Sequence, residues 1–569
     1  MKRIFSLFLA VLMLFGMVAT LAGCSAPKDN GAQFEIYLGN EVCDFDPSDY
    51  YADNTAEQVM SLLYEPLFAI DEKGKLSLAA AENYEINYEE REIVIEIRET
   101  YWSDEVRVTA ADFIYAWNER LLNPNNPNPA AALLYEIENA AAVKGGEGTV
   151  SDVGARATGV YELTITYRDG GDPDLLLRNL AAVATSPVRQ DKVANASSYW
   201  SKMIDTMVFN GPFKVKVFDT TTSQFTLERN RGYHLSLDAK NFMKRVTPGV
   251  MYNFFTPYGQ AISVSAEEIE NNTTFFMCEA TLADRASAKD TAIVADTTSA
   301  YTYAFNPENP LFAIPEVRQA LIMAIDREAI ASALTFGKAA DGILPDACGG
   351  STASLISTTA KLDEARALLA GVNFAGVSKS FAITHANSED EIKIAEIVAA
   401  AWEELGFKVT TRPVGNTKNK VGDSEFYDSR IQMLLKEASY GNYGYDVLGF
   451  DWQFYSQDAF TGLAAFSGVM NGCGFDFSGG VARANVAGYS NVEYDSLIVE
   501  AMKLHGEERA SVLAAAEEML CNDAVICPIV FNQSFAFVSE DLRNVNVDGF
   551  GHFVLTEADL KNYTKYLED

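Results

Sequence analysis

The chain has 569 residues, of which 48% are hydrophobic and 11% aromatic, so it lacks the depletion of apolar residues that marks disordered proteins. Its formal net charge of −35 at pH 7 argues against nucleic acid and anionic lipid as partners, because both reward clustered lysine and arginine. The length exceeds the roughly 250–300 residues at which single cores stop growing, so two or three compact units are expected.

The N-terminal segment is typical of a secretory signal. Lys2 and Arg3 precede an apolar run from Ile4 to Thr20, and small residues lead to Cys24. The run, at roughly 20 residues, is also long enough for an uncleaved membrane anchor. Residues 21–24, Leu-Ala-Gly-Cys, resemble the bacterial lipobox. That resemblance implies cleavage before Cys24, a diacylglycerol on its thiol, and an extracytoplasmic protein held at the bacterial cell membrane.

Hydrophobic periodicity predicts mixed strands and helices in the first half of the chain. In chain order we expect a strand at 34–38, a helix at 54–67, strands at 84–87 and 92–98, a helix at 110–121, and strand regions at 161–167 and 213–229. An Asn-Pro-rich stretch at 123–129 ends the second helix.

The sequence pattern in the second half of the chain predicts further helices and strands. We expect a helix within 305–333, a strand at 381–384, a helix at 391–405, a strand at 408–411, two helices within 493–520 and a buried strand at 526–531. The order from 381 to 411 predicts a βαβ unit. Residues 414–444 exceed what a simple connection needs, so we expect a surface excursion beside a cleft, with a helix from Phe426 to Ala438; a lid that sets specificity is the alternative.

The residues offer little catalytic chemistry. Seven cysteines minus Cys24 leave six, widely scattered; Cys521 and Cys527 either form a bridge or remain small buried thiols. The four histidines are far apart, and the motifs of zinc proteases, serine hydrolases and P-loops are missing from the sequence. We therefore expect no enzyme, no cofactor and no metal.

Several short blocks follow one another along the chain. They are Asp46-Pro47 with Leu63-Tyr64-Glu65-Pro66-Leu67, Tyr101-Trp102-Ser103-Asp104 with Val108-Thr109-Ala110-Ala111-Asp112-Phe113, Ser151-Asp152-Val153-Gly154, Asn210-Gly211-Pro212-Phe213 with Leu227-Glu228-Arg229-Asn230, Val317-Arg318-Gln319-Ala320-Leu321 with Ala324-Ile325-Asp326-Arg327, and Tyr494-Asp495-Ser496-Leu497-Ile498. In this order they resemble the extracytoplasmic solute-binding proteins of peptide-type ABC importers, family 5, above all the oligopeptide-binding proteins. On the helix block we expect Arg318 and Asp326-Arg327 to pair or cap.

The resemblance implies an α/β fold of the periplasmic-binding-protein type (type II, cluster C), with two lobes around a hinge that the chain crosses twice. The divisions it implies are a lipoprotein signal peptide at 1–23, a tether at 24–33, first-lobe segments at 34–77, 208–300 and 532–569, an extra domain at 78–207 and a second lobe at 301–531. A ligand would bind between the lobes of a monomer, close them and be delivered to an ABC permease.

The resemblance also places the ligand site. Peptide-binding members carry "G-W-x-x-D-Y-x-D/E-P" at the stretch that here runs from Gly449 to Ala459. The aspartate that holds the ligand's α-ammonium falls on Tyr455, and the closing proline falls on Ala459. The expected ligand contacts are Asp451, Trp452, Gln453, Phe454, Tyr455 and Asp458, together with Asp53 and Asn54 after the first strand.

The departure at Tyr455 leaves the cargo open. Asp451 or Asp458 could replace the missing carboxylate; otherwise the ligand is a peptide without a free N-terminus or is no peptide, and the aromatic residues of the stretch could stack on its rings. Alternatives within the same fold bind a glycan, nickel or haem, although 443–460 contains neither His nor Met. A peptide-sensing receptor, or an exported hydrolase that pairs Asp451 with Asp458, are the other readings.

Overall fold

The computed structural model describes residues 33–37, 42–49, 52–196, 199–219, 224–238, 247–252, 277–278, 282, 285–286, 289–350, 353–422, 424–470 and 485–561. Cys24, the expected signal peptide and all but the last residue of the expected tether lie outside these residues. Within the described ranges, the structure contains no helix whose length and apolar character would let it cross a membrane.

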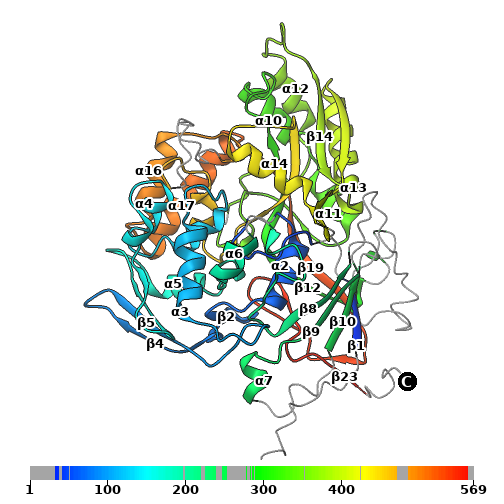
Figure 1. Cartoon of the computed structure of the whole chain (residues 1–569). Coiled ribbons are helices and arrows are strands. Elements are labelled where there is room, and N and C mark those ends of the chain that lie inside the picture. Colours follow the sequence, from blue (N-terminus) through cyan, green and yellow to red (C-terminus); the bar gives the residue numbers. More distant parts are fainter. Residues whose placement is uncertain are drawn as a thin grey trace, which may run out of the picture.

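An eleven-stranded sheet connects two halves of the molecule, in the order β15-β14-β18-β12-β19-β11-β1-β10-β9-β8, with β13 paired to β19. Its two longest strands, β12 (Ala292–Phe305) and β19 (Ile526–Val538), are antiparallel neighbours that run through both halves (Figure 1). The lower half in Figure 1 holds β1 (Gln33–Tyr37), β8 (Phe213–Asp219), β9 (Gln224–Arg229), β10 (Thr247–Tyr252) and β11 (Met277–Cys278). The upper half holds β13 (Lys338–Ala339), β14 (Ser380–Ala386), β15 (Lys408–Val414) and β18 (Val447–Gln453).

The ladder between the two long strands is interrupted where the halves meet. β12 loses its pairing with β19 between Asp296 and Ala300, and an interruption of this kind locally bends a strand. The side chains of Thr297 and Ser299 are buried there, and their hydroxyls lie 2.8 Å apart. The chain thus passes from the lower half to the upper along β12 and returns along β19.

The predicted βαβ unit is confirmed in the upper half. β14 and β15 pair in parallel, and α13 (Glu389–Glu404) connects them. The helix expected within 305–333 is confirmed as α10 (Pro315–Met323), but it ends before Ile325, and α11 (Arg327–Leu334) is a separate helix. Asp326 starts the second of them by accepting a hydrogen bond from the Ala329 amide at 2.9 Å. α12 (Leu362–Leu369) completes this layer.

Two arginines of the helix block bind backbone carbonyl oxygens. The Arg327 side chain is fully buried and donates to the carbonyls of Pro528 at 2.7 Å, Ser357 at 3.1 Å and Ile322 at 3.2 Å. Arg318 donates to the carbonyls that end neighbouring segments, at 2.6–3.0 Å. The expectation that these residues pair or cap is thus confirmed as capping, by Asp326 at the start of α11 and by Arg318 at the carbonyls after α17 (Gly506–Asn522).

The excursion at 414–444 forms a hairpin and a helix. β16 (Thr417–Val421) pairs with β17 (Ser424–Asp428), and α14 (Arg430–Ser439) follows. The helix predicted to begin at Phe426 therefore starts later, because the preceding residues belong to the hairpin and Ser429 is the N-cap.

A second unit, residues 81–196, lies beside the large sheet and is called the side unit here. Its antiparallel sheet has the order β4-β5-β7-β6 and contains the strands predicted at 84–87, 92–98 and 161–167. The elements are β4 (Ala81–Asn87), β5 (Glu92–Ile97), α3 (Ala110–Ile114), η1 (Tyr115–Leu121), η2 (Pro129–Leu134), α4 (Ala140–Lys144), η3 (Val150–Asp152), β6 (Ala155–Ala157), β7 (Glu162–Thr166), α5 (Pro173–Asn179), η4 (Val183–Thr185) and α6 (Gln190–Ala196).

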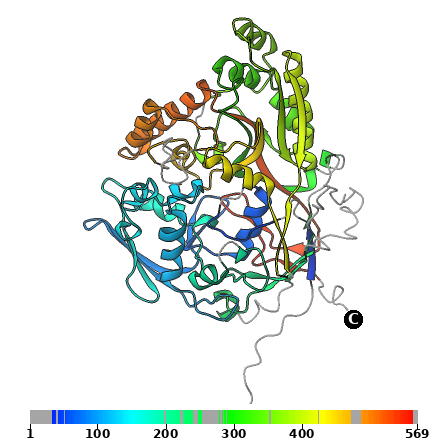
Figure 2. The same cartoon turned by 45° about the horizontal axis from the view of Figure 1, so that its top comes forward.

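The helices between β18 and β19 pack on the side unit. They are α15 (Ala459–Ala464), α16 (Val492–Ala501) and α17 (Gly506–Asn522), and Figures 1 and 2 both show the orange helices next to the cyan segment that carries α4 and α5. Tyr135 donates a hydrogen bond to the carbonyl of Met470 at 2.8 Å, and Ser456 donates to Asn179 at the same distance. The upper half and the side unit therefore contact each other closely.

The remaining elements are short, apart from α2. They are β2 (Phe68–Ile70) with β3 (Leu76–Leu78), β20 (Leu542–Arg543) with β23 (Asp559–Leu560), β21 (Asn546–Val547) with β22 (Phe553–Val554), α7 (His234–Asp238), η7 (Lys289–Thr291) and η8 (Asp346–Cys348). α2 (Asn54–Leu63) ends earlier than predicted, because the residue before Pro66 disfavours helical backbone. Cys521 and Cys527 are free thiols, so the bridge is not formed.

Candidate functional site

A cavity lies between α2 and the upper half, and we call it the cleft. Its lower wall includes Asp44, Asp53 and Ala56, and its upper wall includes Glu391 of α13 and Asp451 of β18, with Asn416, Ser429, Ile431, Gln432 and Phe450 beside them. It encloses about 60 Å³, which corresponds to roughly four to six waters. Any ligand larger than this space can enter only if the two walls separate.

Asp53 and Asp451, two of the residues expected at the site, line this cleft, and two more, Asn54 and Gln453, lie next to them. The side-chain oxygen of Asn54 accepts hydrogen bonds from Ser299 Oγ at 2.6 Å and from Gln453 Nε2 at 2.9 Å. Asp53 caps α2 by accepting from the amide of Thr55 at 2.7 Å. Asp451 accepts from Asn532 Nδ2 at 2.9 Å. The start of α2, the end of β18 and both long strands therefore converge on one point.

The aromatic residues Trp452 and Phe454 face away from the cleft. Trp452 is 3% exposed and stacks on Phe466, with ring centroids 4.7 Å apart. Phe454 also stacks with Trp452, with ring centroids 6.3 Å apart, and its amide donates to the carbonyl of Thr298. Both rings belong to a buried apolar cluster that also contains Phe450, and of these three rings only Phe450 lines the cleft.

Tyr455 stands at the position where peptide binders carry their aspartate, and it is buried, with 1% of its surface exposed. Its backbone has φ of 59°, a left-handed conformation that is unusual for an aromatic residue and is often found at functional sites. It does not line the cleft.

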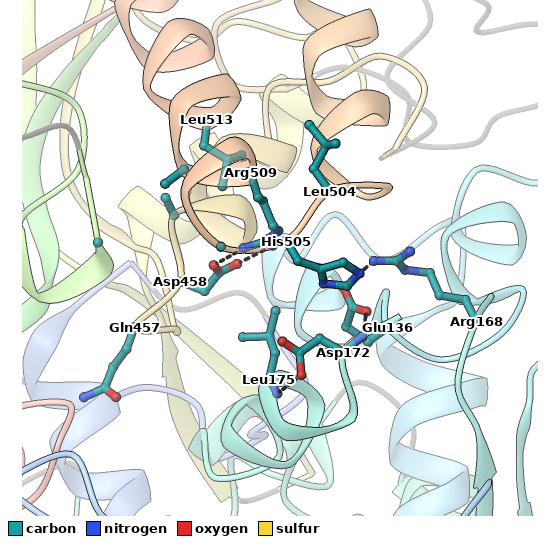
Figure 3. Close-up of a pocket in the computed structure, with 14 residues that line it drawn as sticks. Glu136, Arg168, Asp172, Leu175, Gln457, Asp458, Leu504, His505, Arg509 and Leu513 are labelled. Carbon is teal, nitrogen blue, oxygen red and sulfur yellow. Dashed lines mark hydrogen bonds and ion pairs between the residues drawn. The ribbon is translucent and has the colours of Figure 1, made fainter. Parts of the chain in front are cut away.

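Asp458 lines a second cavity of about 250 Å³ between the side unit and α17 (Figure 3). Its carboxylate accepts two hydrogen bonds from Arg509, at 2.5 and 2.9 Å, and caps α15 through the Phe460 amide. In the same cavity Glu136 pairs with Arg168 at 2.8 Å. Both arginines drawn in Figure 3 are thus paired with a carboxylate, while Asp172 caps α5, and Asp458 and Asp451 line different cavities.

The cleft is acidic. Burial raises the pKa of Glu391 to about 8, with the charge of Asp451 adding to the effect. Burial likewise raises the pKa of Asp451 to about 7, helped by Asp53, and that of Asp44 to about 6 despite nearby Lys202. Sequence reasoning missed Glu391 and Asp44, because a glutamate in the first turn of a helix has an ordinary local explanation and Asp44 belongs to no recognisable local motif.

Tyr301 fixes the orientation of Glu391. Its hydroxyl donates to Glu391 Oε2 at 3.0 Å, and the Ala386 amide donates to the same oxygen at 2.8 Å. Gly449, on the neighbouring strand, makes room for this tyrosine, because a Cβ there would lie 2.2 Å from Tyr301 Oη. The carboxyl group is thus positioned by β12, β14 and β18 together.

Two ion pairs join the walls at the rim of the cleft. Lys202 pairs with Asp428 at the end of β17, and Lys436 of α14 pairs with Asp49 at 2.5 Å. Lys202 also lies 3.5 Å from Asp44. We call Lys202–Asp428 and Lys436–Asp49 the rim pairs. The excursion 414–444 therefore borders the cleft and reaches the opposite wall.

His552 holds the lower wall by contacting α2, and this contact predicts a pH dependence. Burial disfavours its imidazolium, but the charges of Asp548 and Glu57 outweigh burial and raise its pKa to about 10. Because the pKa of His552 is higher in the folded than in the unfolded protein, its protonation stabilises the fold. This contribution is fully present below the unfolded pKa of about 6.5 and is lost as the pH rises through 10. We expect the melting temperature to fall between pH 6.5 and 10 more steeply in the wild type than in His552→Gln.

Differential scanning fluorimetry across this range measures the difference. His505→Gln is the matched control, since His505 is exposed and should leave the wild-type slope intact. If the melting temperatures of the wild type and His552→Gln changed in parallel with pH, the raised pKa of His552 would be contradicted.

Comparison with known proteins reveals the family. Residues 75–471, more than half of the chain, match the model described as "Bacterial extracellular solute-binding proteins, family 5 Middle". The dipeptide-binding protein DppE of Bacillus subtilis is 26% identical, over 98% of this chain and all of that protein. The probable deoxycholate-binding periplasmic protein YgiS of Escherichia coli is 25% identical, over 84% of each chain.

A solved structure, titled "Listeria monocytogenes OppA bound to peptide", superposes with a TM-score of 0.75 at 20% identity, covering 93% of this chain and 99% of that one. The expected two-lobed fold of the periplasmic-binding-protein type is thereby confirmed. The protein is a member of the bacterial extracellular solute-binding proteins, family 5.

Proposed function

We propose that this protein captures an oligopeptide in the cleft, closes its two halves around it and delivers it to an ABC permease. The observation that carries the proposal is the convergence of Asn54, Gln453 and Asp451 at the point where the two long strands join the halves. A ligand held there touches both walls, so it gains contacts only in the closed form and shifts the equilibrium toward closure. DppE and the Listeria protein, which are named for dipeptide binding and bound peptide, support this cargo.

We also propose that Cys24 carries a lipid that holds a monomeric receptor outside the cytoplasm, beside its permease. The support is the Leu-Ala-Gly-Cys sequence behind an apolar run. Tethering raises the local receptor concentration at the permease without new contacts. Mass spectrometry of the N-terminal fragment from membranes would show a diacylglycerol on Cys24; an unmodified, uncleaved N-terminus would contradict it.

Native purification followed by denaturation and mass spectrometry tests the cargo. We expect short peptides to be released in about one-to-one ratio with the protein and without chemical change. A uniform non-peptide compound would overturn the peptide proposal. Release of cleavage products from an added peptide library would favour a hydrolase; the two aspartates on which that alternative depends, Asp451 and Asp458, line different cavities.

A bile-acid ligand is the alternative raised by similarity to YgiS. Deoxycholate carries a carboxylate, whereas the cleft contains four acidic side chains (Asp44, Asp53, Glu391 and Asp451) and, among its described lining residues, no lysine, arginine or histidine. Burying an anion against buried carboxylates is unfavourable. The electrostatics of the cleft therefore favour the peptide.

A further inference from the structure

The upper wall of the cleft contains two carboxyl groups without a countercharge. Asp451 and Glu391 form no ion pair with any lysine, arginine or histidine that the structure describes. Their neighbours are Asp53 at the start of α2, Tyr301 on β12, Asn532 on β19 and Asp390 on α13, of which the last already pairs with Arg285. A buried carboxylate needs either a proton or a cation.

A second feature points to a ligand in the same cavity. Gln432 of α14 lines the cleft and is 8% exposed, yet its side-chain nitrogen has no hydrogen-bond acceptor among the described residues. Leaving such a donor unpaired costs about 1–3 kcal/mol, so its natural partner is an acceptor supplied by a ligand. The cleft therefore offers a site for a positive group beside a donor for a carbonyl oxygen.

We propose that the cleft selects ligands that carry a cationic group, a primary ammonium or a guanidinium, and holds that group on Asp451 and Glu391 beside the ring of Phe450, with Gln432 donating to a ligand carbonyl. This inference rests on the proposed function and names its ligand class. It also explains how a chain with Tyr455 at the usual aspartate position can retain a cationic ligand, because the carboxylates come from a different strand position and from α13.

Binding is coupled to proton release. The raised pKa values mean that Glu391 is mostly protonated and Asp451 about half protonated at pH 7 without a ligand. An entering ammonium stabilises the ionised form of both carboxyl groups. About one proton therefore leaves the protein for each ligand bound at pH 7. Affinity then rises by about tenfold or more from pH 5.5 to 7.0, a range in which a peptide α-amino group, with a pKa of about 7.7–8.0, stays charged.

The test is isothermal titration calorimetry of the full-length protein with trialanine, N-acetyl-trialanine, N-acetyl-Lys-Ala-Ala and spermidine, in buffers of different ionisation enthalpy. We expect trialanine to bind at least about thirtyfold more tightly than its acetylated form and to release about one proton. If the acetylated lysine peptide recovers the affinity, the side chain supplies the cation; if it does not, the α-ammonium does.

Two variants locate the effect. Asp451→Asn and Glu391→Gln should each reduce trialanine affinity by about thirtyfold and bring the ratio between free and acetylated peptide close to one. Glu404→Gln is the matched control, since Glu404 lies on the same helix as Glu391 but outside the cleft, and its effect should stay within about twofold. Circular dichroism confirms that each variant is folded, and the wild-type pH and proton measurements stand without any variant.

The outcomes separate this inference from the proposed function. Equal affinity of wild type for trialanine and N-acetyl-trialanine, with no proton release, would overturn the cation site while peptide binding stands. Spermidine binding that Asp451→Asn abolishes, with no binding of any peptide, would overturn the peptide cargo and support the cation site.

Discussion

Removing both rim pairs together should weaken ligand binding by about tenfold and open the unliganded protein. The double variant Asp428→Asn, Lys436→Gln leaves the net charge unchanged but breaks both ion pairs between the walls. All four side chains are at most about one-third exposed, at 17–32%, so these pairs are screened less than ordinary surface pairs. Asp44 and Asp428 raise the pKa of Lys202 despite its burial, which shows that their charges stabilise the ammonium.

The effect on affinity follows from the equilibrium between open and closed forms. The rim pairs exist only while the walls are together, so they stabilise the closed form that binds ligand. Their loss, at about 0.7 kcal/mol each, amounts to about 1.4 kcal/mol and hence to tenfold in affinity. Calorimetry with trialanine measures the affinity, and small-angle X-ray scattering of the ligand-free protein should show a larger radius of gyration.

The chain supplies a matched control in the same hairpin. Lys418 and Glu425 form an ion pair between β16 and β17 that does not cross the cleft. The variant Lys418→Gln, Glu425→Gln also keeps the net charge and should leave affinity and scattering unchanged. If both double variants behave alike, closure does not depend on the rim pairs and is governed by the apolar contact of the upper half with the side unit.

Replacing Arg327 with methionine should destabilise the protein by about 3–5 kcal/mol. The guanidinium is fully buried and donates to four backbone carbonyls: Ile322 and Ile325 at the end of α10, Ser357, and Pro528 on β19. Methionine fills similar space but leaves these carbonyls without donors, and each buried unsatisfied group costs about 1–3 kcal/mol. The substitution therefore weakens the contact of α10 and α11 with β19, one of the two long strands that join the halves.

Urea unfolding followed by tryptophan fluorescence measures this loss. Arg327→Lys should be intermediate, because an ammonium retains the charge but cannot reach all of these carbonyls with the fixed geometry of the guanidinium. Arg366→Met is the control, since Arg366 is 47% exposed and pairs only with surface acids in the described structure, so its effect should stay within about 0.5 kcal/mol. A change below 1 kcal/mol for Arg327→Met would show that the network is dispensable.

Element types could be predicted from the sequence because periodicity is a local property. The βαβ unit from β14 to β15 and the strands of the side unit follow from runs of apolar residues and their spacing. The errors fall at boundaries, where single residues decide: Pro66 ends α2 early, and Asp326 starts a new helix within one apolar pattern. These are effects of caps and prolines that compete with periodicity.

The candidate site was predictable only in part. The correspondence with family blocks selected the stretches around residues 53 and 451–458, and the structure brings Asp53, Asn54, Asp451 and Gln453 together. It does not bring Trp452, Phe454 or Tyr455 into the cleft, and Asp458 lies in another cavity. That any of these residues contacts a ligand stays a prediction.

By itself the sequence determined the family and the order of most helices and strands. These depend on local patterns and on short motifs, each of which can be compared with the family separately. Only the tertiary structure decided which side chains share the cleft. β12 sets the register of β18, and that register places Asp451 opposite Tyr301 while the neighbouring Trp452 enters the core. Glu391 joins them from a helix about sixty residues earlier, since the parallel pairing of β14 with β18 sets that helix beside the cleft. A local sequence pattern cannot predict this arrangement, because whether a carboxyl group is buried or solvated depends on residues that only the tertiary structure brings next to it.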